Sequence, residues 1–213
     1  MSSFFRNATH RSLTITSLVL LLLCTASAAV PKNRMIESAS LPDEPVEITA
    51  IKVKEANVKF WEKFAADEDW LSGITFTVKN TSEKRISHVE LLIEQSISET
   101  LSFTIPVGVG EFRPLTQSAA GPAIALPGET VEIRLSDERY KGFRNAVPVE
   151  YKFVPVTEVK VHIERVVFTD GSMWYKGMLH YRDPNNPRRW FPAPGEKERF
   201  IEKMHSRQKN PDN

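Results

Sequence analysis

Cysteine is almost absent from this chain of 213 residues, which contains a single one, Cys24. One cysteine excludes a disulfide scaffold and any zinc site built from several thiolates. The 9 glycines and 14 prolines are too few for a collagen-like or low-complexity chain. Neither sign of charge dominates, since 28 Lys and Arg stand against 27 Asp and Glu, a net charge of +1. This balance excludes a nucleic-acid-binding protein held by its overall electrostatic field.

The longest apolar run lies near the N-terminus and predicts an export signal. A basic segment with Arg6 and Arg11 precedes the apolar stretch Leu13–Cys24, and Ala26–Ala28 forms an A-x-A cleavage site. A membrane anchor would need roughly 20 apolar residues, so we favour cleavage over anchoring. We expect residues 1–28 to be a signal peptide cleaved after Ala28, leaving a secreted or periplasmic protein with no stable membrane span.

Cys24 raises a lipoprotein alternative. A lipobox has a small residue directly before its cysteine, whereas Leu23 stands at that position here. Cleavage after Ala28 would remove Cys24 and leave the mature chain without cysteine.

The rest of the chain divides by composition. Residues 29–41 are polar and without periodicity, which predicts a mobile linker. Residues 42–194 carry the apolar patterning and form the expected domain. Residues 195–213 are charged and predict a tail with one marginal helix around Phe200, in which the last ten residues are disordered.

Alternation of apolar and polar residues dominates the domain and predicts half-buried antiparallel strands. The expected strands are Val46–Val53, Ile74–Lys79, Val89–Glu94, Leu101–Val107, Val131–Leu135, Val159–Phe168 and Met173–Tyr181.

Turn and cap signals punctuate these strands. Ser136 is a helix N-cap and predicts a short helix over Asp137–Asn145. Asp170-Gly171 predicts a hairpin turn, and Trp61–Trp70 predicts a loop or one helical turn.

About seven strands with turns between them predict an all-β, antiparallel β-sandwich with short helical segments in its loops. Three features refine this: the strand that runs into Asn80-Thr81-Ser82, the alternation of Val89–Ile93, and the Pro127-Gly128-Glu129 turn before a strand. With them, Val46–Phe168 resembles exported bacterial immunoglobulin-like domains. The resemblance implies an immunoglobulin-like sandwich and a role in adhesion, assembly or spacing. The Cys…Trp…Cys pattern of antibody domains is absent.

Motifs for catalysis and for cofactor binding are missing. The histidines show no H-E-x-x-H or H-x-H spacing, and His162 falls on the polar side of its strand. No G-x-S-x-G elbow is present, and Gly108-Val109-Gly110 lacks the third glycine of a dinucleotide loop. We therefore expect no enzyme, no catalytic residue and no cofactor. A hydrolase stays the least favoured alternative, because its two carboxylates need not be close in sequence.

Segments rich in oxygen-bearing side chains raise two questions, whether they bind calcium and whether an asparagine is glycosylated. Asp67, Glu68 and Asp69, and separately Asp183 in its turn, are candidate calcium ligands, but neither segment has EF-hand spacing, so we predict no metal site. Asn80 begins a formal N-glycosylation sequence whose use depends on the host.

Aromatic and arginine residues gather near the last predicted hairpin and are the candidate binding residues. They are Trp174, Tyr175, Tyr181, Arg188, Arg189 and Trp190. The structural alternative is that tryptophans close the ends of the sandwich core. We predict an exported, non-enzymatic binding protein whose partner is a protein or a polysaccharide of the cell envelope, and no nucleic acid. A carbohydrate-binding module with exposed tryptophans is the alternative, and an exposed edge strand is a second route to a protein partner.

Overall fold

The structure is a computed structural model that describes residues 32–96, 101–112, 121–147, 151, 155–186 and 188–209. The expected signal peptide lies outside the described residues, as do the first three residues of the expected linker. The described residues belong to one compact unit that begins at Lys32. No helix within them is long and apolar enough to cross a membrane.

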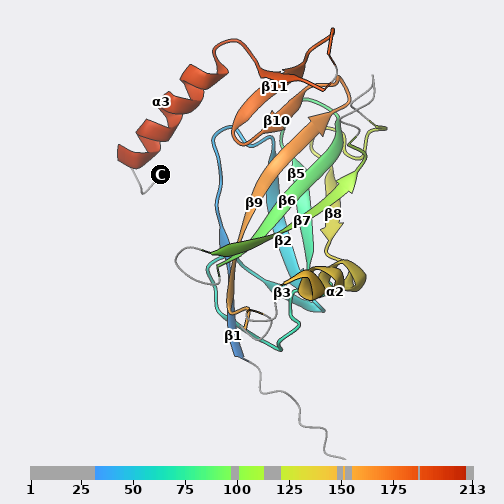
Figure 1. Cartoon of the computed structure of the whole chain (residues 1–213), viewed down its shortest axis with the longest axis vertical. Helices are drawn as coiled ribbons and strands as arrows, with labels where there is room; N and C mark the ends of the chain where they lie inside the picture. Colours follow the sequence, from blue (N-terminus) through green and yellow to red (C-terminus); the bar gives the residue numbers. More distant parts are fainter. Residues whose placement is uncertain are drawn as a thin grey trace, which may run out of the picture. The chain divides into compact units, whose positions relative to one another are not determined.

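Two β-sheets and two helices form this unit (Figure 1). The eight-stranded sheet contains β1 (Lys32–Ser38), β4 (Phe64–Ala66), β6 (Ile86–Ser96), β7 (Ser102–Gly110), β9 (Glu158–Phe168), β10 (Met173–Tyr175), β11 (Met178–Arg182) and β12 (Trp190–Pro192). The four-stranded sheet contains β2 (Val46–Val53), β3 (Ala56–Val58), β5 (Thr75–Asn80) and β8 (Thr130–Arg134). The helices are α2 (Asp137–Ala146) and α3 (Glu196–Lys209).

The mostly-β, two-sheet prediction agrees with this structure. The expectation of a purely antiparallel sandwich of about seven strands is wrong, because β1 runs parallel to β9 and the described residues form twelve strands. The large sheet is therefore mixed.

Strand β9 is the centre of the large sheet. One of its edges pairs with β6 along most of its length. Its other edge is shared, since β1 pairs with residues 158–161 and β10 with residues 165–167. The sheet therefore forks, with β1 and β4 on one branch and β10, β11 and β12 on the other.

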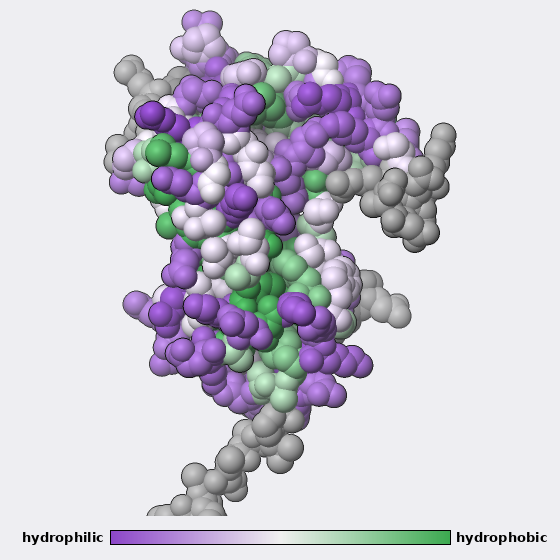
Figure 2. All heavy atoms as spheres, turned by 180° about the vertical axis from the view of Figure 1, so that it is seen from behind, coloured by the Kyte–Doolittle hydropathy of each residue, from purple (hydrophilic) through white to green (hydrophobic). Residues whose placement is uncertain are grey.

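Apolar side chains of both sheets fill a single core. β9 contributes Val159, Val161, Ile163 and Val166, and the four-stranded sheet contributes side chains such as Phe76. From behind the view of Figure 1, hydrophilic side chains cover most of the surface, and apolar groups show in a strip down the middle of the lower half and in smaller groups in the upper half (Figure 2). Burial between the sheets accounts for this mainly hydrophilic cover.

The expected linker is where the prediction fails most. Residues 32–38 of that linker form β1, in which the buried side chains are Arg34 and Ile36. Because a charged residue occupies one of the buried positions, the sequence of this segment does not alternate between apolar and polar residues, and it therefore predicts a polar linker. Strand β4, inside the expected loop Trp61–Trp70, forms because it pairs with β1.

Two further boundaries differ. The expected strand Met173–Tyr181 is split by a turn at Lys176 (φ 50°) and Gly177 (φ 86°), two positive φ angles that suit a two-residue hairpin. Helix α3 continues to Lys209, into the tail that we expected to be disordered, and residues 210–213 lie outside the described part. By contrast, α2 begins where its N-cap predicts, with the Ser136 side chain accepting a hydrogen bond from the Arg139 N–H.

Asn80 is built into the fold. Its side chain is 1 % exposed. Its Nδ2 donates to the carbonyl of Lys84 at 2.8 Å, and its Oδ1 accepts from the Ser82 N–H and hydroxyl at 3.0 and 2.7 Å. The folded protein therefore does not present Asn80 to a glycosyl donor.

Arg34 and Trp70 join β1 to the start of β9. The Arg34 guanidinium (Nη1) and the Trp70 indole N–H both donate to the carbonyl of Val156 at 2.8 Å. Arg34 Nη2 also donates to the carbonyl of Asp67 at 2.9 Å. Because both side chains are buried, these hydrogen bonds form away from water and fix the parallel β1–β9 pair.

Arg34→Met and Trp70→Phe each remove one donor to the Val156 carbonyl. Each change should lower the free energy of unfolding by about 1.5–3 kcal/mol, measured by urea denaturation. The double variant should lose more than the sum, since only then does the buried carbonyl lose both donors. Additivity to within about 0.5 kcal/mol would contradict this coupling.

Candidate functional site

Alternation in the C-terminal extension, β10 to β12, separates the predicted binding residues. Trp174 lies opposite Leu179, Tyr181 opposite Phe191, and Arg182 opposite Trp190. Residues opposite each other in an antiparallel pair share a face, as do residues two apart along a strand. Two faces result. The inner face contains Trp174, Leu179, Tyr181 and Phe191, and the outer face contains Tyr175, Arg182 and Trp190.

The outer face is a closed cluster of rings and guanidinium groups. Arg165 on β9 lies 4.9 Å from the Phe112 ring centre and 5.5 Å from that of Tyr175, and it pairs with Glu90 at 3.0 Å. Arg182 covers the Trp190 ring at 5.2 Å. Because these flat surfaces cover one another, the cluster stabilises the sheet and leaves little ring area for a ligand.

Two histidines complete the outer face. The His88 ring stacks on Phe112 at 5.7 Å and lies against Gly108, where a Cβ atom would sit 3.2 Å from the ring. Burial lowers the pKa of His88, and burial likewise lowers the pKa of His180. His180 also contacts the Tyr175 ring edge-on at 5.9 Å. Burial therefore disfavours the charged form of both imidazoles, and both rings belong to the packing.

The inner face, in contrast, exposes large aromatic side chains. Tyr181 is 47 % exposed and Phe191 is 44 % exposed, and they lie directly opposite each other. The Arg189 guanidinium lies 5.0 Å from the Phe191 ring centre. Two exposed rings beside a cation form an accessible contact surface.

A hollow of about 310 Å³ lies on the same face and is lined by Leu179, two residues before Tyr181 on β11. Apolar side chains of Phe168, Trp174 and Leu179 line it, and Pro45 adds to them. Charged residues also line it: Asp43, Glu83, Lys84, Glu196 and Arg199. Lys84 is fixed there, because its Nζ donates to Asp170 at 2.8 Å and to Ser172 at 2.9 Å and lies 5.2 Å from the Phe168 ring centre.

The hydrogen bonds at β12 bear on the edge-strand route. Asp183 N donates to the Arg189 carbonyl at 3.0 Å, and Ala193 N donates to the Leu179 carbonyl at 2.7 Å. By alternation, the backbone groups of Phe191 face β11, and those of Trp190 and Pro192 face the free edge. Pro192 has no N–H, so this edge offers few donors to a partner strand. The geometry favours contact through side chains over strand addition.

The structure thus distributes the six predicted residues. Trp174 is buried and Tyr181 is exposed, both on the inner face, whereas Tyr175 and Trp190 are half-buried on the outer face. Arg188 lies exposed in the turn before β12, and Arg189 covers Phe191. Sequence reasoning missed Phe191, Leu179 and Phe168, although the alternation that carries Leu179 and Tyr181 to one face is readable from the sequence.

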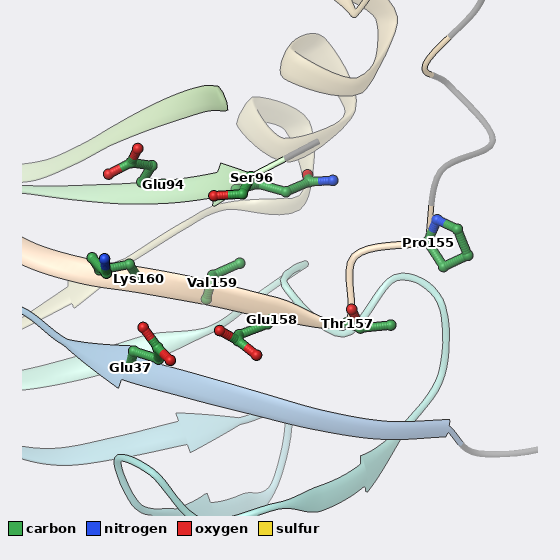
Figure 3. A pocket seen from close by; sticks show the side chains of 9 residues that line it. Glu37, Glu94, Ser96, Pro155, Thr157, Glu158, Val159 and Lys160 are labelled. Carbon is green, nitrogen blue, oxygen red and sulfur yellow. The ribbon is translucent and has the colours of Figure 1, made fainter. Parts of the chain in front are cut away.

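A second hollow, also of about 310 Å³, lies on the other branch of the sheet (Figure 3). The carboxylates of Glu37 on β1 and Glu158 on β9 point toward each other there, with Lys160 and Glu94 nearby (Figure 3). A hydrogen bond with Glu37 raises the pKa of Glu158, helped by burial and by the neighbouring negative charge. The two carboxyl groups are thus closer than the roughly 5–10 Å that glycoside hydrolysis uses.

Asp67, Glu68 and Asp183, three of the candidate calcium ligands, have protein partners of their own. Asp67 contacts Lys54, and Glu68 pairs with Lys32 at 3.6 Å. The Asp183 carboxylate accepts a hydrogen bond from the Asn185 N–H at 2.8 Å, as in an Asx turn. Within the described ranges, no group of three or more His, Cys, Asp or Glu side chains is placed to hold a metal ion.

Comparisons of the chain with protein-family models, with curated proteins and with solved structures find no match. The resemblance to exported immunoglobulin-like domains therefore stays a prediction.

Glu158→Gln tests the carboxylate pair through its pH dependence. A raised pKa means that the folded state binds more protons than the unfolded state, so the free energy of unfolding falls as pH rises through the raised value. The window begins near the ordinary glutamate pKa of about 4.3 and extends upward. In Glu158→Gln, the urea midpoint should depend less on pH within this window. At pH values above the window, the variant should be more stable than the parent protein. A profile that matches the parent protein would show that the pair does not share a proton.

Proposed function

We propose that this chain is an exported, non-enzymatic binding protein of the cell envelope or extracellular space. Its immunoglobulin-like sandwich is the scaffold, and the inner face of the C-terminal extension is its binding surface. Export is supported by the basic segment, the short apolar run and the A-x-A site within residues 1–28.

One observation carries the binding proposal: the exposed Tyr181–Phe191 pair lies on the same strand face as Leu179, which lines an apolar hollow. Exposed aromatic side chains beside a pocket are typical of interaction surfaces, where they bury a large area at a small cost in side-chain entropy. The surrounding charges of Lys84, Glu83 and Arg199 supply the polar rim that such surfaces have.

The partner best suited to this surface is a protein. A hollow of this size accommodates one apolar side chain of a partner against Phe168, Trp174 and Leu179, while the partner's backbone lies over Tyr181 and Phe191. The partner does not need to add a strand to the edge of β12, because its contact with this surface is made by side chains.

A carbohydrate-binding module is the alternative, and the same pair of rings supports it. Tyr181 and Phe191 offer two neighbouring aromatic side chains for stacking on sugar rings. The form of this alternative that relies on tryptophans is less favoured, because Trp70 and Trp174 are buried. Trp61 is 57 % exposed but lies outside the extension.

A hydrolase would have to use the Glu37–Glu158 pair in the second hollow, although its carboxyl groups lie closer together than glycoside hydrolysis uses. Glu158 is exposed to water, which weakens the desolvation that tunes a catalytic carboxyl group. Activity toward polysaccharide or ester substrates that disappears in Glu158→Gln would establish this function over binding.

Phe191→Ala and Tyr181→Ala test the binding surface. The chain without residues 1–28 would be crosslinked to envelope and secreted material of the source cells, and the captured partner then titrated. Each variant should weaken binding about 10–100-fold, because central aromatic contacts contribute about 1.5–3 kcal/mol.

Trp61→Ala is the matched control, since it removes another exposed ring outside the extension. Equal loss of binding in Trp61→Ala, or unchanged binding in both inner-face variants, would contradict the proposal. Capture of polysaccharide with no protein would support the carbohydrate alternative.

A further inference from the structure

Helix α3 contacts the rest of the described protein through its first two turns. The Glu196 carboxylate accepts a hydrogen bond from the Leu179 N–H at 2.9 Å. The Phe200 ring lies against Gly177, where a Cβ atom would collide with it. On the opposite side of the helix, Ile201 is exposed. Phe200 thus provides an apolar contact of α3, on the side of the helix away from Ile201.

Ion pairs supply the remaining contacts. Lys203 Nζ lies 2.5 Å from both carboxylate oxygens of Asp43, and Arg199 lies 3.7 Å from the same carboxylate. All three side chains are about half exposed, so water and salt screen these pairs. A helix of this length is marginal on its own, so α3 depends on these weak contacts and is expected to detach well before the core unfolds.

Asp43 makes these pairs from a left-handed backbone conformation. Its φ of 55° is in the left-handed region, which non-glycine residues seldom adopt. The loop around it is fixed by the Glu44 carboxylate, which accepts a hydrogen bond from the Leu41 N–H at 2.6 Å. Asp43 is thereby presented to α3 from a separate part of the chain.

The same residues line the inner-face hollow. Asp43, Glu196 and Arg199 lie along its wall, and Trp174 and Leu179 form its apolar lining. The first turn of α3 is thus one side of the hollow. Movement of this turn would uncover Leu179, whose N–H now donates to Glu196.

We infer that α3 is a strap that narrows the inner-face hollow, that Asp43 latches it, and that its release opens the hollow to a partner. This inference rests on the proposed function, because it concerns access to the same surface. The latch is electrostatic, so raised ionic strength releases it.

Thiol labelling tests the strap without any partner. Leu179→Cys in the full chain with Cys24→Ser places a single thiol in the lining of the hollow, and iodoacetamide, an uncharged reagent, reports its access. Asp43→Asn removes the latch charge, and asparagine tolerates the left-handed conformation. At low salt this change should speed labelling about three- to tenfold.

Salt and a matched variant complete the design. In 1 M NaCl, where the Debye length is about 3 Å, the chain with Asp43 should label about as fast as the Asp43→Asn chain, which should itself respond little to salt. Glu62→Gln is the control, since it removes another exposed acid that pairs with a lysine, Lys59, at 3.3 Å outside α3. It should leave the labelling rate unchanged.

Hydrogen exchange provides a second readout that needs no cysteine. In Asp43→Asn with Leu179 intact, the amides of α3 and of Leu179 should exchange about three- to tenfold faster than in the parent chain. Unchanged exchange in α3, or labelling that responds neither to Asp43→Asn nor to salt, would overturn the strap. Failure of Phe191→Ala to weaken capture would count against the proposed function alone, so the two failures are distinguishable.

Discussion

The large sheet depends on one strand, β9, because two branches share a single edge of it. β1 occupies the first part of that edge in parallel, and β10 occupies the last part in antiparallel. A parallel strand cannot be attached by a tight turn, so β1 must be held by other means. Arg34 and Trp70 provide them, since both donate to the Val156 carbonyl just before β9 begins. This junction fixes the branch that contains β1 and β4, and it leaves the last part of the β9 edge to the C-terminal extension, β10 to β12.

In the C-terminal extension, the alternation of side chains along each strand determines which residues share a face. Residues that are neighbours in sequence, such as Trp174 and Tyr175, face opposite sides of the sheet, one toward the core and one toward the Arg165 cluster. A cluster in sequence is therefore not a cluster in space, and residues from different strands combine instead. Tyr181 and Phe191 meet because β11 and β12 pair, and Leu179, on the same face as Tyr181, lines a hollow together with the buried side chains of Phe168 and Trp174.

Much of the fold was predictable wherever burial follows a period of two. Ile74–Lys79 and Val131–Leu135 lie within one residue of the bounds of β5 and β8, and the Ser136 cap fixes the start of α2. Prediction failed where a polar residue is buried or where pairing is long-range. Arg34 hides the alternation of β1, and β4 has three residues that become a strand only through β1. For the candidate site, the composition of the sequence located the right segment. Which of its side chains share a face of the sheet depends on the Lys176-Gly177 turn, because this turn sets the register of β10 on β11.

Two lysine–carboxylate pairs border the hollow, and their surroundings differ in a way that bears on access. Lys84 and Asp170 lie close together at one turn, where Asp170 also accepts hydrogen bonds from the N–H and hydroxyl of Ser172 at 2.9 and 2.6 Å. Burial alone would raise the pKa of Asp170, but these bonds and Lys84 lower it, so the pair is well formed in the folded state. Lys203 and Asp43, in contrast, join a helix to a distant loop, and Arg199 of the same helix also pairs with Asp43. One side of the hollow is consequently rigid and the other adjustable, which is the asymmetry that a surface needs if it is to admit a partner without disturbing the core behind it.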